Sequence, residues 1–159
     1  MEILVVSDTH HKSWEELHPT IQQLVTQTDL TIHCGDFTNF SLVKSFQSKA
    51  RHFVGVHGNS DDTDIRQGIP SKQVIQIEGF KFGITHPMWG GPPFELTELF
   101  SDFSDNLDVI LFGHIHEPIN KLEEGVRFIN PGQGYSSFLV PATIALLTVF
   151  KNKIHAEIR

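Results

Sequence analysis

Residues that can bind metal ions or move protons occur in five short motifs along the chain. In order they are Asp8-Thr9-His10, Gly35-Asp36, Gly58-Asn59, His86 and Gly113-His114-Ile115-His116. Imidazole, carboxylate and amide ligands without thiolate suit Mn²⁺, Fe²⁺, Co²⁺, Ni²⁺ or Zn²⁺. The single cysteine, Cys34, excludes both an intrachain disulfide and a cysteine zinc cluster. The motifs therefore predict a metal centre of mixed nitrogen and oxygen ligands, provided that the fold brings them together.

Each motif comes directly after a short apolar run typical of a strand. The runs span residues 2–7, 30–33, 52–56, 80–84 and 109–112. Ligands of open α/β sheets bind at the carboxyl ends of strands, so distant motifs can meet at one edge. In an extended chain alternate residues point the same way, so Asp8 and His10 could reach one ion. The glycines at 35, 58 and 113 would let the backbone bend or approach closely beside each ligand.

The remaining pattern predicts the elements that position these motifs. Apolar residues at helical spacing predict helices over 14–26, 39–48 and 94–103. Two late runs, 143–150 and 154–158, flank Lys151-Asn152-Lys153, which predicts a hairpin turn. Strands alternating with helices, followed by strand-rich sequence, indicate an α/β domain with a mixed sheet or two sheets. With 159 residues, we expect one domain over residues 1–159.

Composition narrows the class of partner. The net charge is −7 and no stripe of Lys or Arg occurs, so extended nucleic acid is not an expected partner. A small phosphorylated substrate remains compatible with this charge, because bound metal would reverse the local field. The longest apolar run, 138–150, is interrupted and too short to span a membrane, and residues 1–7 lack the features of a signal peptide. We therefore expect a soluble, cytoplasmic protein.

Taken together and in this order, the five motifs resemble those of the calcineurin-like metallophosphoesterases. The chain length, the surroundings of Asp36 and Asn59, and Asn130-Pro131-Gly132 resemble the small, single-domain YfcE-like phosphodiesterase branch, over residues 1 to about 135. The resemblance implies a four-layer α/β/β/α sandwich of two mixed sheets flanked by helices. It also implies a site for two divalent metal ions.

The resemblance assigns a role to each motif residue. Asp8, His10 and His116 would bind the first metal ion, Asn59, His86 and His114 would bind the second, and Asp36 would bridge them. It implies hydrolysis of a phosphate ester by a metal-activated hydroxide in an in-line attack. Its catalytic residues would be Asp36, Asn59, His86 and His114. We expect Mn²⁺ first, with Ni²⁺, Co²⁺, Fe²⁺ or Zn²⁺ as alternatives.

Some positions depart from the family pattern or stay open. Ser60 stands where many members have a His that acts on the leaving group, as is usual in the small branch. Without an obvious general acid, we expect a preference for diesters with a good leaving group. Asp61 would either orient a ligand or be a solvated loop acid, and the role of His57 is open. Trp89 and Phe94 would either line the substrate mouth or pack over a helix.

Two other functions compete with a phosphodiesterase. A phosphomonoesterase or nucleotidase of the same superfamily would share every metal residue. A protein-binding scaffold like the retromer subunit Vps29 would share the fold and many of the residues. The complete set of seven ligand positions favours catalysis. The physiological substrate depends on loop shape and is not predicted, and a homo-oligomer is compatible with the sequence.

Overall fold

The computed structural model describes residues 1–88, 95–104 and 106–159, and these residues contain two five-stranded sheets. The first has the order β10-β9-β1-β2-β3, formed by Lys153–Ile158, Ala145–Phe150, Glu2–Val6, Leu30–His33 and Phe53–Gly55. The second has the order β4-β5-β6-β8-β7, formed by Lys72–Ile77, Phe80–Thr85, Val109–Phe112, Val126–Asn130 and Ile119–Glu123. Each sheet combines parallel pairs with antiparallel pairs, so the expectation of two mixed sheets is confirmed.

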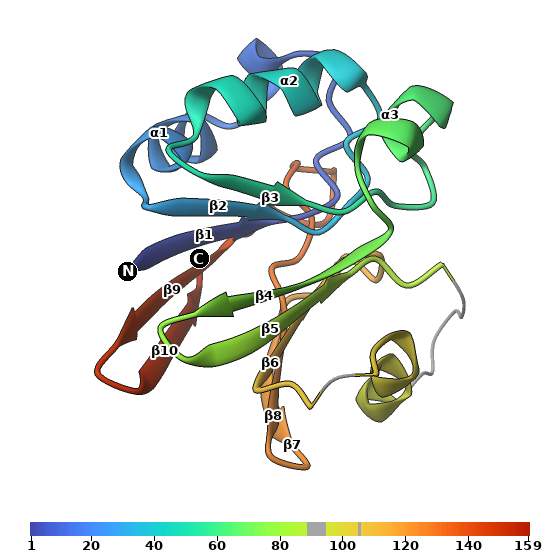
Figure 1. The fold of residues 1–159 in the computed structure, drawn as a ribbon. Coiled ribbons are helices and arrows are strands. Elements are labelled where there is room, and N and C mark those ends of the chain that lie inside the picture. The colour runs from blue at the N-terminus through green and yellow to red at the C-terminus, as the bar shows by residue number, and fades with distance from the viewer. Residues whose placement is uncertain (89–94, 105) are drawn as a thin grey trace.

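Helices cover the outer face of each sheet (Figure 1). Over the first sheet lie η1, α1, α2 and α3, formed by Trp14–Glu16, Pro19–Gln27, Phe40–Lys49 and Thr63–Gly68. Against the second sheet packs the 3₁₀ helix η2, Leu96–Asp102. The order of layers is therefore helix, sheet, sheet, helix, which confirms the predicted four-layer α/β/β/α sandwich.

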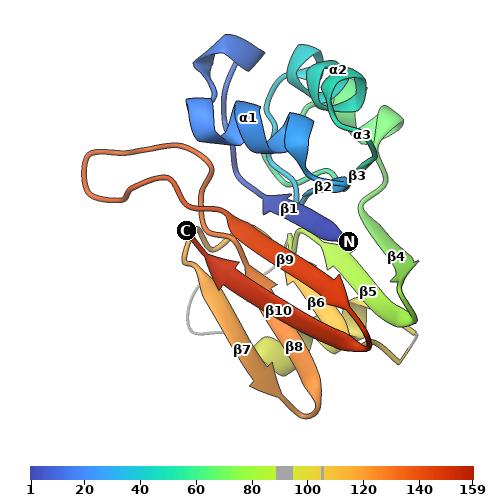
Figure 2. The same cartoon turned by 90° about the vertical axis from the view of Figure 1, so that its left-hand side faces the viewer.

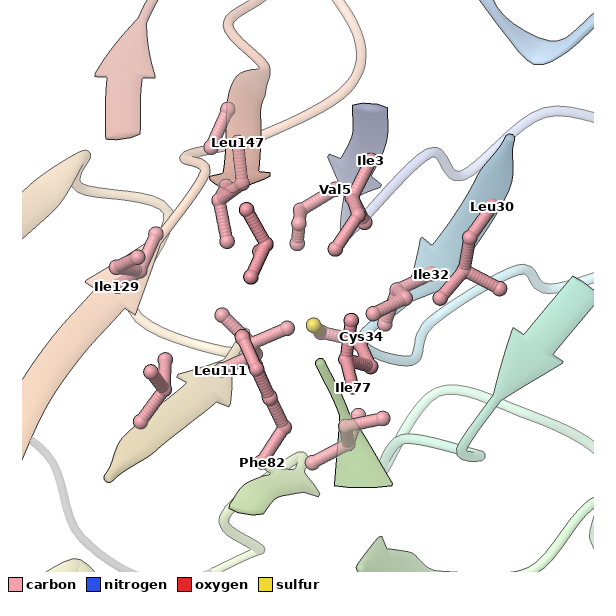
Figure 3. Packing of buried hydrophobic residues seen from close by; sticks show 14 of the residues in the cluster. Ile3, Val5, Leu30, Ile32, Cys34, Ile77, Phe82, Leu111, Ile129 and Leu147 are labelled. Carbon is pink, nitrogen blue, oxygen red and sulfur yellow. The ribbon is translucent and has the colours of Figure 1, made fainter. Parts of the chain in front are cut away.

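The main hydrophobic core lies between the two sheets (Figure 3). On β1, Ile3 and Val5 belong to this core, whereas Leu4 and Val6 belong to the core beneath the helices. A strand buried on both faces explains why β1 is a continuous apolar run and does not alternate with polar residues. Full burial of such a side chain contributes about 1.5–3 kcal/mol.

Two helical expectations differ from the structure, and one helix was not expected. The stripe over 14–26 is split into η1 and α1, because Pro19 begins a new helix at a position where its missing N–H costs nothing. The third predicted helix is a 3₁₀ helix, whose three-residue repeat places Leu96 and Leu99 on one buried face. Helix α3 was not predicted; it is six residues long and begins with a cap, in which Asp62 accepts the Ile65 N–H.

The predicted hairpin at the end of the chain is confirmed. Lys151 and Asn152 both have positive φ, 47° and 59°, and connect β9 to β10. Two successive left-handed residues match the right-handed twist of a two-residue hairpin. None of the described helices is long and apolar enough to cross a membrane.

Candidate metal centre

The seven predicted ligands lie at the carboxyl ends of five strands and come together in one cluster. Two groups have ligand atoms within 4.8 Å of one another: Asp8, His10 and His116, and Asp8, Asp36 and His86. Asn59 joins them through Oδ1, which lies 3.1 Å from Nε2 of His86 and 2.8 Å from Nδ1 of His114. Both sheets contribute, since β1, β2 and β3 carry four of these residues and β5 and β6 carry three.

Distances within the cluster fit donors that share cations. Asp8 Oδ1 lies 3.1 Å from His116 Nε2 and 4.0 Å from His10 Nε2. Asp36 Oδ2 lies 3.6 Å from Nε2 of both His10 and His86. Ligands bound about 2 Å from one metal ion are themselves separated by about 3–4 Å. Asp8 is common to both groups, and Asp36 lies equally close to a histidine of each proposed metal site, His10 and His86.

Two buried polar atoms without hydrogen-bond partners indicate that a cation binds at this place. Asp8 Oδ2 accepts hydrogen bonds from the Ser7 hydroxyl and the His114 N–H. Within the described residues, Asp8 Oδ1 and His10 Nε2 are buried and have no hydrogen-bond partner. An unsatisfied buried polar atom costs about 1–3 kcal/mol. A divalent ion would satisfy both atoms at once, so the residues present fit the metal that the motifs predict.

The tautomer of His86 also fits a metal ligand. Its Nδ1 lies 2.7 Å from the carbonyl oxygen of Cys34, so Nδ1 carries the proton and donates it. In the neutral ring Nε2 then carries a lone pair. The two oxygens that it faces, Asn59 Oδ1 and Asp36 Oδ2, are also acceptors. A backbone carbonyl that fixes the ring nitrogen away from the metal is a common support for histidine ligands.

The electrostatics of the first group couple Asp8 to His116. Burial acts to raise the pKa of the Asp8 carboxyl, but His116, His86 and the Ser7 hydroxyl together lower it. The same contact with Asp8 is the main reason that the pKa of His116 is raised. Without metal the pair therefore favours a carboxylate beside an imidazolium, and a metal ion would have to displace that proton.

The backbone at the site is unusually strained. Asp8, His10, Asp36, His114 and His116 all have positive φ, between 48° and 81°. Most other non-glycine residues with positive φ in the described part of the chain lie in hairpin turns. Strained conformations of this kind cluster at functional sites. The expectation that Asp8-Thr9-His10 is extended is wrong, because both potential ligands are left-handed, yet they still meet in one group.

Two glycines are required by close approach, as the sequence predicted. A Cβ added at Gly35, which has φ +98°, would lie 2.5 Å from Nδ1 of His86. A Cβ at Gly58 would collide with the side chain and the backbone nitrogen of Asp36. A larger residue at either position would push a candidate ligand out of place.

Ser60 and Asp61 hold the loop that carries Asp36. Ser60 donates from its N–H and its hydroxyl to the two oxygens of Asp36, both at 2.8 Å. Asp61 is buried and accepts the backbone N–H groups of Asp36, Thr38 and Gly58 at 2.7–3.0 Å. A solvated loop acid is therefore the wrong interpretation of Asp61. Its burial, aided by the charge of Asp36, raises the pKa of Asp61 in spite of these donors.

His33 connects the first two ligand loops. Its Nδ1 accepts the N–H of Gly35, and its Nε2 lies 3.1 Å from the hydroxyl of Thr9. The ring stacks on Phe37 with 3.6 Å between centroids. Burial lowers the pKa of His33 to about 3, although Asp8 acts in the opposite direction. The imidazole is therefore neutral, and its two hydrogen bonds connect Thr9 to Gly35.

Sequence reasoning missed Tyr135, the only tyrosine. Its ring packs edge-on against His10 and His116, with 5.4 and 6.1 Å between centroids. The preceding Gly134 donates its N–H to the carbonyls of Ser7 and Asp8, which anchors this loop to the site. Tyr135 follows no predicted strand and belongs to no motif, so only its position shortly after Asn130-Pro131-Gly132 could have signalled it.

Of the other open positions, the structure describes His57 alone. His57 is half-buried, lies outside both groups of potential ligands, and has its Nδ1 3.5 Å from the Gly58 carbonyl oxygen. Trp89 and Phe94 lie outside the described residues.

The sequence model for the calcineurin-like phosphoesterase superfamily domain matches residues 1–152. The chain belongs to this superfamily. It is a metallophosphoesterase, and the family and the ligand cluster both point to divalent metal ions at this edge of the sandwich.

Similar proteins agree with this assignment. Phosphodiesterase MJ0936 of Methanocaldococcus jannaschii is 27% identical over an alignment 169 positions long, which covers 96% of each chain. The solution structure of protein TM1076 of Thermotoga maritima has a TM-score of 0.77 and 30% identity, covering 99% of this metallophosphoesterase and 98% of that chain. Vps29 of Entamoeba histolytica, in a crystal structure with Zn²⁺, has a TM-score of 0.74 at 22% identity, covering 100% and 98%. The last likeness shows the fold alone.

Proposed function

We propose that this metallophosphoesterase is a phosphodiesterase that uses two divalent metal ions. The convergence of all seven motif side chains, with Asp8 Oδ1 and His10 Nε2 buried and without a hydrogen bond, carries the proposal. Asp8, His10 and His116 would hold one ion, Asn59, His86 and His114 the other, and Asp36 both. Two such ions supply a hydroxide near neutral pH and hold the phosphoryl oxygens for in-line displacement.

The residues of the chain then prepare the site for this chemistry. Asp36 is held by both donors of Ser60, so the carboxylate keeps one orientation. His86 is held by the Cys34 carbonyl, and Asp8 by Ser7 and the His114 N–H. Preorganised ligands of this kind cost little reorganisation when the reaction takes place. We propose Mn²⁺ as the preferred ion; the nitrogen and oxygen ligands without sulfur suit it, and they also suit Ni²⁺, Co²⁺, Fe²⁺ or Zn²⁺.

Ser60 supports a preference for diesters with good leaving groups. Its hydroxyl is already bound to Asp36, and so it does not replace the leaving-group histidine that many members of the superfamily carry. General acid catalysis commonly contributes about 10²–10⁴ in rate, so leaving groups that need a proton should react slowly. The 27% identity with a named phosphodiesterase points to the same class of ester.

The decisive experiment measures hydrolysis of bis-p-nitrophenyl phosphate and p-nitrophenyl phosphate. The protein is treated with EDTA, and Mn²⁺, Ni²⁺, Co²⁺, Zn²⁺ or Mg²⁺ is returned singly. We expect metal-dependent cleavage that is faster for the diester, and loss of most activity in Asp36→Asn. Asp64→Asn, an exposed acid in the first turn of α3, is the matched control and should behave like the wild type.

Metal binding alone would not decide the question, because Vps29 of Entamoeba histolytica has been crystallised with Zn²⁺. Turnover is therefore the required readout. Folded protein that binds metal and hydrolyses neither ester would refute the enzyme and favour a scaffold. Faster cleavage of the monoester would instead favour a phosphomonoesterase.

A further inference from the structure

The loop between β8 and β9 carries an apolar tip into solvent. Phe138 is 100% exposed, Leu139 84% and Val140 40%. Figure 2 shows this loop projecting past α1, away from both sheets. Loop tips are normally polar or rich in glycine and proline, so adjacent exposed Phe and Leu side chains need an explanation. Exposed apolar patches of this kind mark sites of interaction.

Hydrogen bonds hold the tip in place. The Ser137 N–H donates to the Val140 carbonyl at 2.9 Å and closes the turn around Phe138 and Leu139. Below it, the Ala142 N–H donates to the Ser136 hydroxyl, and the amide of buried Gln133 donates to the Tyr135 carbonyl. The tip is therefore presented in a defined shape, which lowers the entropy that binding would cost.

A groove lies beside the base of the same loop. It has a volume of about 380 Å³ and lies between α1, the loop and the start of β9. Ile21 and Leu24 of α1 form one wall, and Pro141, Ala142 and Ile144 form the other. Among the residues that line it, none is acidic, although the chain has 19 acidic residues. The groove thus has apolar walls beside polar lining residues and the cationic Arg159, so a second acidic chain can approach it without meeting an acidic lining residue.

We propose that this face forms a two-fold symmetric dimer, in which the Phe138-Leu139 tip of each copy enters the groove of the other. A projecting tip and an apolar groove on one face are the two halves of a self-complementary surface, and two-fold symmetry uses both halves twice. The partner is a second copy because one loop carries both an exposed apolar tip and, at its base, a groove with apolar walls. A groove lining without acidic residues also lessens the repulsion that a net charge of −7 per copy would cause elsewhere.

The proposal is independent of catalysis and is tested by the mass of the protein in solution. Sedimentation from about 1 to about 200 µM should show a rise from 18.0 kDa towards twice that value, with a dissociation constant on the order of micromolar. The double variant Phe138→Ser/Leu139→Ser should weaken the dimer at least tenfold. Both side chains are largely exposed, so the fold should tolerate this change.

A groove variant and a matched control complete the test. Thr20→Glu places a carboxylate at the groove in the first turn of α1, where a negative charge favours the helix, and should also weaken the dimer. Phe150→Ser removes another exposed Phe, 61% exposed and outside the groove lining, and should leave the mass unchanged. A tagged Phe138→Cys chain mixed with an untagged Thr20→Cys chain should form a mixed disulfide under mild oxidation, because the tip of one copy enters the groove of the other. The native Cys34 is buried and should not compete.

Two results would overturn the proposal. If the wild-type chain stays at the monomer mass over the whole concentration range, the groove does not bind a second copy and its partner is a different protein. A dimer that responds to Phe150→Ser but to neither the tip nor the groove variant forms through another surface. Diester hydrolysis measured on the same samples separates this result from a failure of the proposed activity.

Discussion

At the scale of single residues, the metal centre depends on side chains that do not themselves bind metal. Asp61 illustrates this, because one buried carboxylate gathers the N–H groups of Asp36, Thr38 and Gly58. It thereby fixes the loop of Asp36, the proposed bridging ligand, against the loop that carries Asn59. Supporting partners of metal ligands commonly contribute a factor of about 10–100 in affinity.

Asp61→Asn should therefore weaken metal binding while the chain stays folded. The amide keeps a single acceptor oxygen in place of two, so at least one of the three N–H groups loses its partner. We expect the concentration of Mn²⁺ needed for half-maximal diester cleavage to rise about 10–100-fold, with activity recovering at high metal. Calorimetric titration of the metal provides the binding constant directly. Equal metal affinities for Asp61→Asn and the control Asp64→Asn would contradict this role.

At the scale of elements, the end of β2 contributes to both stability and the site. His33 is neutral there, stacked on Phe37 and hydrogen-bonded to the loops of Thr9 and Gly35. Its pKa falls on folding from 6.5 to about 3, mainly because burial disfavours the charged ring. The unfolded chain therefore binds this proton more readily than the folded chain does. The contribution of His33 to the free energy of unfolding is complete above about pH 6.5 and is lost as the pH falls towards 3.

His33→Gln should flatten this part of the pH dependence. The free energy of unfolding of the wild type should fall more steeply between pH 6.5 and 3 than that of the variant. The difference has an upper limit of roughly 4–5 kcal/mol, at about 1.4 kcal/mol per pKa unit. Urea denaturation at several pH values measures both curves. Parallel curves would show that the histidine is not held neutral by the fold.

Sequence predicted the elements well where one strong signal decided them. The strand ends before Asp8, Asp36 and His114 could be placed because a buried apolar run stops at a polar motif. The break at Pro19 and the 3₁₀ form of η2 could not be predicted, since apolar spacing alone does not separate one helix from two or an α-helix from a 3₁₀ helix.

The site shows the same division. Ligand types and order predicted which side chains meet, whereas the left-handed backbone at Asp8 and His10 is only weakly signalled, since Asp and His adopt it more often than most residues but still rarely. The contacts of Asp61 and Tyr135 depend on tertiary packing that spacing does not encode.

At the scale of the whole molecule, the metal centre lies where the two sheets meet. Asp8 and Asp36 come from the first sheet, and His86 and His116 from the second. Metal ions bound here would connect the two halves of the sandwich outside their shared core. An ion that binds only the folded chain stabilises it in proportion to the logarithm of its concentration.

Removal of metal should therefore lower the melting temperature. At an ion concentration 100 times the dissociation constant, each site adds about 2.7 kcal/mol, and each kcal/mol raises the melting temperature of a domain of this size by about 2–4 °C. Calorimetry with EDTA and with added Mn²⁺ measures the shift, and Asp36→Asn should show a smaller one. The prediction fails if no divalent ion changes the melting temperature of the folded protein.

The left-handed residues of the centre set stability and function against each other. A non-glycine residue in this conformation costs about 1–2 kcal/mol, and glycine at the same place is largely free of that cost. In the absence of metal, His10→Gly should relieve strain and remove a potential ligand in the same step. Selection for thermal stability alone would thus draw this protein away from its chemistry, so a stabilised variant has to be sought at positions outside these loops.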